Sequence, residues 1–402
     1  MSKRVLLLAA TTGYQTRMFA DEAQRMGLDL VLATDRCHVL EDPWGDSAVP
    51  VRFEDPAAGI ESLIEYGPFD GVVAVGDRPA LVAAQAAVAL GLPFSPPSAV
   101  LAAHNKFLAR EHFRKAGMLT PRYRLVADSS DRASAYPCVL KPLTLSGSRG
   151  IIRANNELEF VEAFARIMKL LESEKATSLQ VEDFIPGREY ALDGLVTGGR
   201  LQVLALFDKP DPLDGPFFEE TIYVTPSCEP AEIQQAIFET TQRAVVALGL
   251  TQGPIHAEMR VNESGVWMLE VAARPIGGLC SRVLQFGPKA SLEHIVLRHA
   301  LGEDVRDTRL APGSHGVMMI PIPSAGVYAG VEGVDAARRL DGIEDIVITA
   351  KEGQTLVPLP EGASYLGFIF ARAESADGVT LALRESHSRL RFHLSKALPV
   401  VR

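Results

Sequence analysis

Cysteine is scarce in this sequence and its spacing is irregular. The four cysteines form no CxxC pair, so the sequence indicates neither a zinc site nor a disulfide framework, and it is typical of a protein in a reducing cytoplasm. Long apolar runs are also missing. The longest candidate, LVAAQAAVALGL at 81–92, is too short to span a bilayer, and VLLLAA at 5–10 is too short for a signal peptide. We therefore expect a cytoplasmic protein with no membrane partner.

An excess of basic residues is absent as well. The 402 residues carry a net charge of −10, with a pI near 5.5. This balance argues against nucleic acid as a partner and favours a small ligand. The composition, 47% hydrophobic and 22% charged, is that of a globular chain with room for two or three domains.

Two nucleotide-binding fingerprints are missing. Strands alternate with helices over residues 1–97, which predicts a parallel sheet, but the first turn contains Gly13 alone and no GxGxxG. GxxxxGK is absent from the whole chain. Gly76 and Asp77 follow a strand at the edge where open sheets bind ligands, but a solvated turn is the favoured interpretation of these two residues. The proline-rich stretch at 93–98 predicts the first domain boundary.

The most informative stretch is GPIHAEMRVNESGVWMLEVAARPIGG at 253–278, which predicts a β-hairpin. In its first strand His256, Glu258 and Arg260 share one face. If residues 263–265 form a three-residue loop with Gly265 in the left-handed conformation, Glu258 faces Glu270 across the ladder.

Two carboxylates in that position repel each other unless a divalent cation lies between them. An all-oxygen ligand set suits Mg²⁺, with Mn²⁺ as the alternative, and implies a nucleotide substrate. The competing interpretation is a hairpin whose glutamates point into solvent. Arg274, Gly277 and Gly278 weigh against it, because they provide a cation and a small-residue turn that a substrate can approach.

Two lysines accompany a glycine-rich turn. Lys141 lies on a short strand before residues 146–150, which we call the flap; its backbone amides could wrap a phosphate, or the turn could be an ordinary hairpin. Asn105 can cap a helix that starts with Lys106, a cation at the positive end of a helix, which implies either an anion beside it or exposure to solvent. The flap residues singled out are Ser146, Gly147, Ser148 and Gly150.

Further along the chain, Glu182 and Glu189 flank a Pro-Gly turn. The acidic, proline-rich loop at 208–220 presents Lys209 and Glu220 as ligand contacts or as parts of a mobile surface loop. An amphipathic helix at 290–302 is expected to pack on the catalytic sheet. The residues from 315 predict a separate, small α+β lid or packing domain.

VLKP with its serine-glycine flap, VEDFIPGRE, HAEMR and LEVAARPIGG together resemble the ATP-grasp superfamily of carboxylate-amine ligases over most of the chain. Within it, the sequence is most similar to L-amino acid ligases, which make dipeptides, and to carnosine-synthase-like enzymes. Ala272 stands where many members have a metal-binding asparagine, so a second metal would have one protein ligand fewer. The resemblance implies an α/β and α+β fold: a pre-ATP-grasp domain at 1–97, an ATP-grasp domain at 98–314 with a flap subdomain at about 136–208, and a lid at 315–402.

The resemblance also implies roles for individual residues. Lys106, Lys141 and the flap would bind ATP phosphates, Glu182 and the backbone of Asp183, Phe184 and Ile185 would hold adenine, and Glu189 would hold the ribose. Glu258 and Glu270 would carry magnesium. Arg274 would bind the substrate carboxylate and its acyl phosphate, and His256 could line the amino-acid pocket beside Gly277 and Gly278.

The expected activity is ATP-dependent joining of a carboxylate, such as an amino acid, to an amine, with small-molecule substrates as partners and a homodimer left open. Two alternatives remain. One is a carboxylase of the biotin-carboxylase or purine-pathway type that uses bicarbonate. The other is a nucleotide-binding regulatory protein without turnover, against which Arg274 argues, because nucleotide binding alone does not need it.

Overall fold

The computed structural model describes residues 2–10, 14–35, 48–131 and 133–396. Gly13 and Cys37 lie outside these ranges. Within them, no helix combines the length and the apolar character that a bilayer span requires.

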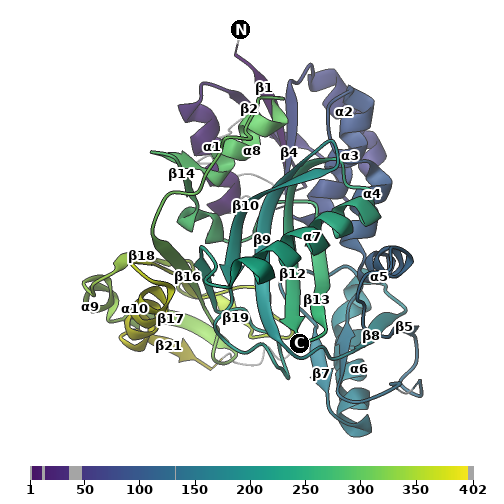
Figure 1. Ribbon diagram of the computed structural model, residues 1–402, viewed down its shortest axis with the longest axis vertical. Coiled ribbons are helices and arrows are strands. Elements are labelled where there is room, and N and C mark those ends of the chain that lie inside the picture. The colour runs from purple at the N-terminus through teal and green to yellow at the C-terminus, as the bar shows by residue number, and fades with distance from the viewer. Residues whose placement is uncertain (1, 11–13, 36–47, 132, 397–402) are drawn as a thin grey trace.

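The N-terminal part is the expected parallel sheet (Figure 1). Its strand order is β3-β2-β1-β4, and each pair is parallel. The strands are β1 (Arg4–Ala9), β2 (Asp29–Thr34), β3 (Ala48–Pro50) and β4 (Gly71–Val75). The helices between and after them are α1 (Tyr14–Arg25), α2 (Pro56–Tyr66) and α3 (Asp77–Leu90). Continuous apolar strands such as RVLLLA are buried on both faces, as a parallel sheet requires.

Two short helices lead into the next domain. They are α4 (Pro97–His104) and α5 (Lys106–Lys115). Asn105 ends the first and caps the second, because its side chain accepts hydrogen bonds from the amides of Phe107 and Leu108 at 3.0 and 3.1 Å. The predicted cap is confirmed.

A small antiparallel sheet with the order β5-β8-β6-β7 follows. Its strands are β5 (Tyr123–Val126), β6 (Cys138–Lys141), β7 (Ile152–Ala154) and β8 (Leu179–Asp183). Helix α6 (Glu157–Leu171) packs on it through Phe160, Phe164 and Ile167 and continues into the 3-10 helix η2 (Glu172–Glu174). Asn156 caps α6 through the amide of Glu159, as the sequence predicts.

The largest sheet has eight antiparallel strands in the order β13-β12-β9-β10-β11-β16-β20-β18. Five strands come from the region before residue 314: β9 (Arg188–Thr197), β10 (Arg200–Asp208), β11 (Ile222–Thr225), β12 (Gln252–Asn262) and β13 (Gly265–Ala272). From the C-terminal region come β16 (Ser314–Ile320), β18 (Ile343–Ile348) and β20 (Gly367–Ala373). The sheet therefore runs without a break across residues 314–315, where we expect a domain boundary.

Different helices cover different parts of this sheet. Helix α7 (Ala231–Leu248) packs along β10 and β13, and α10 (Ala376–Ser388) packs on β16 and β20. A three-stranded sheet, β19-β17-β21, and a short helix complete the C-terminal part. Their bounds are β17 (Gly326–Glu332), α9 (Val334–Arg338), β19 (Thr355–Leu356) and β21 (Arg391–Ser395).

Helix α8 (Leu292–Ala300) packs on the large sheet, as expected, and on the N-terminal sheet as well. It contacts β12 of the large sheet, but it also lies against α1 and β4 of the N-terminal sheet, as Figure 1 shows. Its apolar side chains Ile295, Val296 and Leu297 join a core that includes both sheets. The helix thus joins the two sheets rather than covering one. The 3-10 helix η3 (Cys280–Val283) and the pair β14 (Gln285–Phe286) and β15 (Ala290–Ser291) lead into it.

Candidate active site

Most of the residues expected to bind nucleotide line one cavity of about 570 Å³, which we call the first cavity. Its walls come from the small antiparallel sheet β5-β8-β6-β7 and from the eight-stranded sheet. Phe218 and Leu269 add apolar surface. The predicted residues that line it are Lys106, Lys141, Ser148, Glu182, Asp183, Phe184, Ile185 and Glu189. Gly150 does not line it, because its backbone faces the C-terminal part of the chain.

The residues expected to bind substrate line a second, larger cavity of about 1750 Å³. The predicted residues there are Ser146, Gly147, His256, Arg274, Gly277 and Gly278, joined by Gly76, Asp77 and Glu220. The two cavities share Glu258 and Glu270, together with Lys106 and Ser148. Both carboxylates therefore stand where the first cavity meets the second.

Glu182 anchors the floor of the first cavity. Its carboxylate accepts a hydrogen bond from Arg110 Nε at 3.0 Å and one from Gln180 Nε2 at 2.9 Å, and it forms an ion pair with Lys141. Burial alone would raise the pKa of Glu182, but Arg110 and Lys141 outweigh burial and lower it to about 2. Both oxygens of Glu182 are therefore engaged by protein groups, and Lys141 is fixed in place.

The sequence analysis did not identify Arg110 as a residue of the site. It is 1% exposed, and Nη1 also donates to the carbonyl oxygens of Met268 and Leu269 at 3.1 and 2.9 Å. Its helix shows an ordinary amphipathic pattern, so the sequence holds no local signal for an arginine that connects α5 to β8 and β13.

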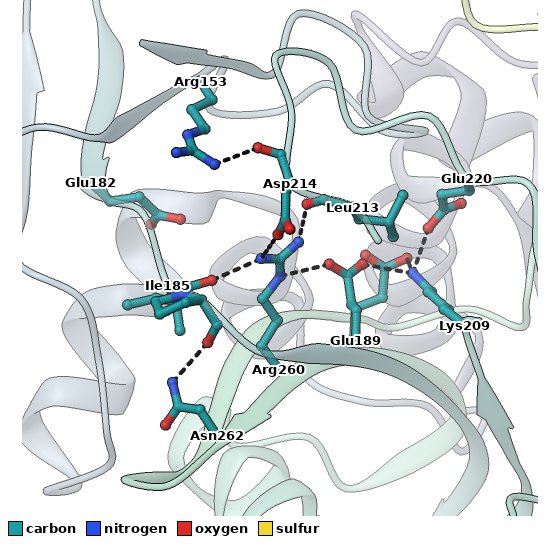
Figure 2. Close-up of polar contacts among 12 residues, drawn as sticks. Arg153, Glu182, Ile185, Glu189, Lys209, Leu213, Asp214, Glu220, Arg260 and Asn262 are labelled. Atoms are coloured by element: carbon teal, nitrogen blue, oxygen red, sulfur yellow. Dashed lines mark hydrogen bonds and ion pairs between the residues drawn. The ribbon is translucent and has the colours of Figure 1, made fainter. Parts of the chain in front are cut away.

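Lys209 lies at the centre of a buried carboxylate cluster (Figure 2). Its ammonium group is 2.9 Å from Glu189, 2.7 Å from Glu220 and 3.6 Å from Glu258, and its side chain is 1% exposed. Burial alone would lower the pKa of Lys209, but the three carboxylates raise it well above its ordinary value. Lys209, at the start of the acidic loop, is thus a buried and ion-paired cation, and it does not belong to a mobile surface loop.

Arg260 closes the other side of this cluster (Figure 2). Nε donates to Glu189 at 3.0 Å, Nη1 donates to the carbonyl oxygen of Ile185 at 2.8 Å, and Nη2 donates to that of Leu213. Glu189 therefore meets a cation on each of its two oxygens. The loop after β10 and the turn after β8 are held together through one guanidinium.

The hairpin pairs Glu258 with Glu270, as predicted, but its turn and its strand register differ from the prediction. The turn has two residues, and Asn262 pairs with Gly265 instead of Val266, so the predicted three-residue loop is wrong. Gly265 does have a positive φ of +121°. The register then shifts by one residue between Glu258 and Met259, which restores the predicted carboxylate pair.

The two paired glutamates have different partners. Glu270 lies 3.4 Å from Lys106, whose Nζ also donates to the carbonyl oxygen of Leu145 at 2.6 Å. The sequence left two possibilities for Lys106, an anion beside it or exposure to solvent. Glu270 is that anion, and the side chain of Lys106 is only 8% exposed. Glu258 instead faces Lys209 and His256. Burial alone would raise the pKa of Glu258, but these two cations lower it to about 2.

Arg274 reaches the N-terminal domain. Its Nε donates to Asp77 at 3.0 Å, and its Nη1 donates to the carbonyl oxygen of Pro275 at 3.1 Å. Burial alone would raise the pKa of Asp77, but Arg274 outweighs it and lowers that pKa. Asp77, the first residue of α3, thus bonds to a cation that follows the hairpin, so the solvated-turn interpretation of Asp77 does not hold.

Asp193 organises the end of the hairpin and escaped the sequence analysis. One oxygen lies 3.3 Å from His256 Nδ1, and the other accepts the amide of Ile276 at 3.0 Å. Burial alone would lower the pKa of His256, but Asp193 and Glu258 raise it to about 9. An aspartate in an otherwise apolar strand, YALDGLV, is the signal that could have found it, because such residues are rarely buried unpaired.

Two carboxylate groupings could hold a divalent cation. The oxygens of Glu189, Glu220 and Glu258 lie within 4.8 Å of one another, but Lys209 already compensates their charge. Glu258 and Glu270 have side chains 24% and 26% exposed and line both cavities. All these donors are oxygens, which fits magnesium. Of these two groupings, the pair at the junction is the one that includes Glu270, which is not in contact with Lys209 and lines both cavities.

Three protein-family models match the chain. The ATP-grasp N-terminal domain matches residues 20–94, the ATP-grasp domain matches 134–283, and the L-amino acid ligase C-terminal domain 2 matches 318–395. The chain therefore consists of ATP-grasp domains followed by the C-terminal domain typical of L-amino acid ligases. The predicted resemblance and fold class are confirmed.

Relatives and solved structures agree with these matches. The ATP-grasp enzyme fsqD of Aspergillus fumigatus is 23% identical over 66% of this chain and 54% of its own length. The alanine–anticapsin ligase of Bacillus subtilis is 26% identical over 54% of this chain and 52% of its own length. The chain thus spans about half the length of these two relatives. The crystal structure of an L-amino acid ligase from Bacillus licheniformis has the same fold, with a TM-score of 0.83, 24% identity and coverage of 98% of this chain and 99% of that one.

We propose that Lys141 binds ATP phosphates. A charge-assisted hydrogen bond contributes about 1.5–3 kcal/mol, so Lys141→Ala should weaken ATP binding by roughly tenfold or more. Calorimetric titration measures this, with Lys169→Ala, which removes an exposed lysine of α6, as the matched control. Equal affinities in the two variants would contradict the assignment.

We also propose that Glu258 and Glu270 hold magnesium. Glu270→Gln should raise the Mg²⁺ concentration needed for half-maximal turnover by more than tenfold, yet change the melting temperature in chelator little, because the repulsion with Glu258 that it relieves offsets the ion pair with Lys106 that it loses. Glu263→Gln, in the exposed turn of the same hairpin, is the control. A large loss of stability without metal would instead mean that the pair is structural.

Proposed function

We propose that this chain is an ATP-dependent ligase that activates the carboxylate of an amino acid or a related acid and joins it to an amine, forming a dipeptide or another amide. The observation that carries the proposal is the junction between the cavities, where Glu258 and Glu270 separate the nucleotide residues from Arg274. The alanine–anticapsin ligase and L-amino acid ligase likenesses support it.

The first cavity would bind ATP. Lys106 and Lys141 supply positive charge for its phosphates, and the flap provides backbone amides. Because both oxygens of Glu182 are engaged, we propose that Glu182 positions Lys141 and that adenine meets the backbone of residues 183–185. Glu189 keeps its proposed ribose contact, since each of its oxygens has a second lone pair.

Arg274 would bind the substrate carboxylate in the second cavity. Two of its three guanidinium nitrogens are held by Asp77 and the Pro275 carbonyl group. This arrangement directs the remaining nitrogen, Nη2, toward a ligand. A planar guanidinium held in this way continues to face the same oxygen after the carboxylate has been phosphorylated.

The proposed reaction has two displacements. First, a carboxylate oxygen attacks the γ-phosphorus of ATP, the bond to the β–γ bridging oxygen breaks, and ADP leaves. Second, the amine nitrogen attacks the acyl carbon, the carbon–oxygen bond to phosphate breaks, and the nitrogen loses a proton. Bound magnesium would neutralise phosphate charge at Glu258 and Glu270. Ala272, opposite His256, contributes no ligand atom.

Arg274→Lys tests the role of the guanidinium. A lysine supplies a point charge without the planar fork, so we expect the turnover rate to fall more than tenfold while ATP affinity stays nearly unchanged. Arg282→Lys is the control, because Arg282 pairs with Asp345 at the surface of the same segment. The assay is ADP and phosphate release with pairwise mixtures of amino acids, with mass spectrometry of the product.

The outcome also separates the alternative functions. If bicarbonate stimulates ADP release and no amino-acid mixture does, the carboxylase interpretation replaces the ligase. If ATP binds but no acceptor stimulates turnover, the chain is a nucleotide-binding protein without ligase activity. A loss of ATP affinity in Arg274→Lys that equals the loss of turnover would contradict the assignment to the carboxylate.

A further inference from the structure

The flap is tied to the C-terminal domain. The amide of Gly150 donates to the carbonyl oxygen of Pro360 at 2.8 Å, and Arg149 Nε donates to the carbonyl oxygen of Glu361 at 2.9 Å. Gly150 packs against Pro142, where a Cβ atom would lie 2.6 Å from the proline ring. The last residues of the flap therefore have a defined position against a loop more than 200 residues away in the chain.

The side chain of Glu361 adds a second tie. Its carboxylate accepts a hydrogen bond from Arg166 Nη2 of α6 at 2.9 Å and also contacts Nε, so the pair is bidentate. The guanidinium of Arg166 lies 5.0 Å from the centre of the Phe217 ring. Both charged side chains are partly exposed, so the pair adds little to global stability. Its effect is to fix where the loop meets the flap subdomain.

The same loop reaches the second cavity. We call residues 357–365 the latch loop. Its turn is tight, because the amide of Gly362 donates to the Pro358 carbonyl group at 2.9 Å and a Cβ at Gly362 would lie 1.7 Å from the Val357 carbonyl oxygen. Ala363 and Tyr365 then line the second cavity. Within a few residues the latch loop therefore contacts the flap on one side and the substrate cavity on the other.

The segment that enters the flap is held from the opposite direction. The amide of Lys106 donates to the Leu143 carbonyl group at 2.9 Å, and its Nζ donates to that of Leu145 at 2.6 Å. Lys106 also faces Glu270 at the junction of the cavities. The flap is thus anchored at its start by the ATP-grasp domain and at its end by the C-terminal domain.

We propose that Glu361 is a positioning residue that holds the flap over the first cavity, and that the latch loop couples amino-acid binding in the second cavity to ATP binding in the first. The identity of the two ligands rests on the proposed function. An amino acid that contacts Ala363 and Tyr365 would stabilise the latch loop, whose Pro360 and Glu361 hold the flap. Coupling of this kind is reciprocal, so ATP must tighten amino-acid binding by the same factor.

Charge reversal tests the latch. Glu361→Arg and Arg166→Glu should each reduce the coupling, and the double variant should restore it, because the ion pair reforms with its charges exchanged. Glu332→Arg is the matched control: it reverses a glutamate of the same domain whose carboxylate lies 3.2 Å from His393. If Glu361→Arg fails to fold, Glu361→Gln keeps the shape of the side chain and removes the charge.

The coupling is measured as the ratio of affinities for a non-hydrolysable ATP analogue with and without a saturating amino acid. We expect a ratio of about fivefold or more in the wild type and in Glu332→Arg, and a ratio near one in Glu361→Arg. A wild-type ratio of one, or a ratio unaffected by Glu361→Arg, would overturn the coupling.

Hydrogen exchange separates this proposal from the ligase assignment. With the ATP analogue alone, amides of residues 146–151 should exchange faster in Glu361→Arg than in the wild type, and the double variant should restore slow exchange. This readout needs no amino-acid substrate, so it can support the latch even if amino acids prove not to be substrates. Unchanged exchange in Glu361→Arg rules out the positioning role of Glu361, whatever the enzyme joins.

Discussion

The ammonium group of Lys209, buried among three carboxylates, is the interaction on which the site depends. Glu189, Glu220 and Glu258 approach from three different strands or loops, and a charge cluster of this density is strongly unfavourable unless a cation shares it. Lys209 supplies that cation without occupying Glu270. Glu258 is therefore paired with Lys209, whereas Glu270 is paired with Lys106 at the junction of the two cavities, where we propose that magnesium binds.

A second set of buried charges positions Lys141, for which we propose a role in nucleotide binding. Arg110 and Lys141 meet the same carboxylate, Glu182, and Arg110 also donates to backbone groups of β13. This arrangement connects the small sheet of the flap subdomain to the hairpin that carries Glu270. The N-terminal domain joins the assembly through Asp77 and Arg274. Buried ion pairs thus link the N-terminal domain, helix α5, the small sheet and the hairpin around the two cavities.

Local patterns in the sequence were sufficient to predict much of the fold. The caps at Asn105 and Asn156, the parallel N-terminal sheet and the carboxylate pair of the hairpin all follow from neighbouring residues, and the structure bears them out. The hairpin turn was predicted incorrectly because a register shift beside Glu258 compensates for a shorter loop, and the strand residues alone do not reveal such a shift.

The contacts between distant segments could not be predicted. Arg110, Asp77 and Asp193 acquire their partners only when strands and helices separated by about 60 to 200 residues pack together. The latch loop gives no signal in sequence, since its contacts with the flap are largely through backbone carbonyl groups. Helix α8 has the amphipathic pattern of a helix that packs on one sheet. This pattern does not reveal that the apolar face of the helix packs against two sheets.

Transfer of oxygen from substrate to phosphate tests the account most directly. An amino acid labelled with ¹⁸O in its carboxylate is incubated with ATP, magnesium and an unlabelled amine acceptor, and the released phosphate is analysed by mass spectrometry. If the carboxylate attacks the γ-phosphorus and the amine then displaces phosphate, one ¹⁸O atom appears in each phosphate formed with product. Phosphate that carries no label, formed together with the amide, would show that the carboxylate is not activated by phosphorylation and would contradict the proposed ligase chemistry.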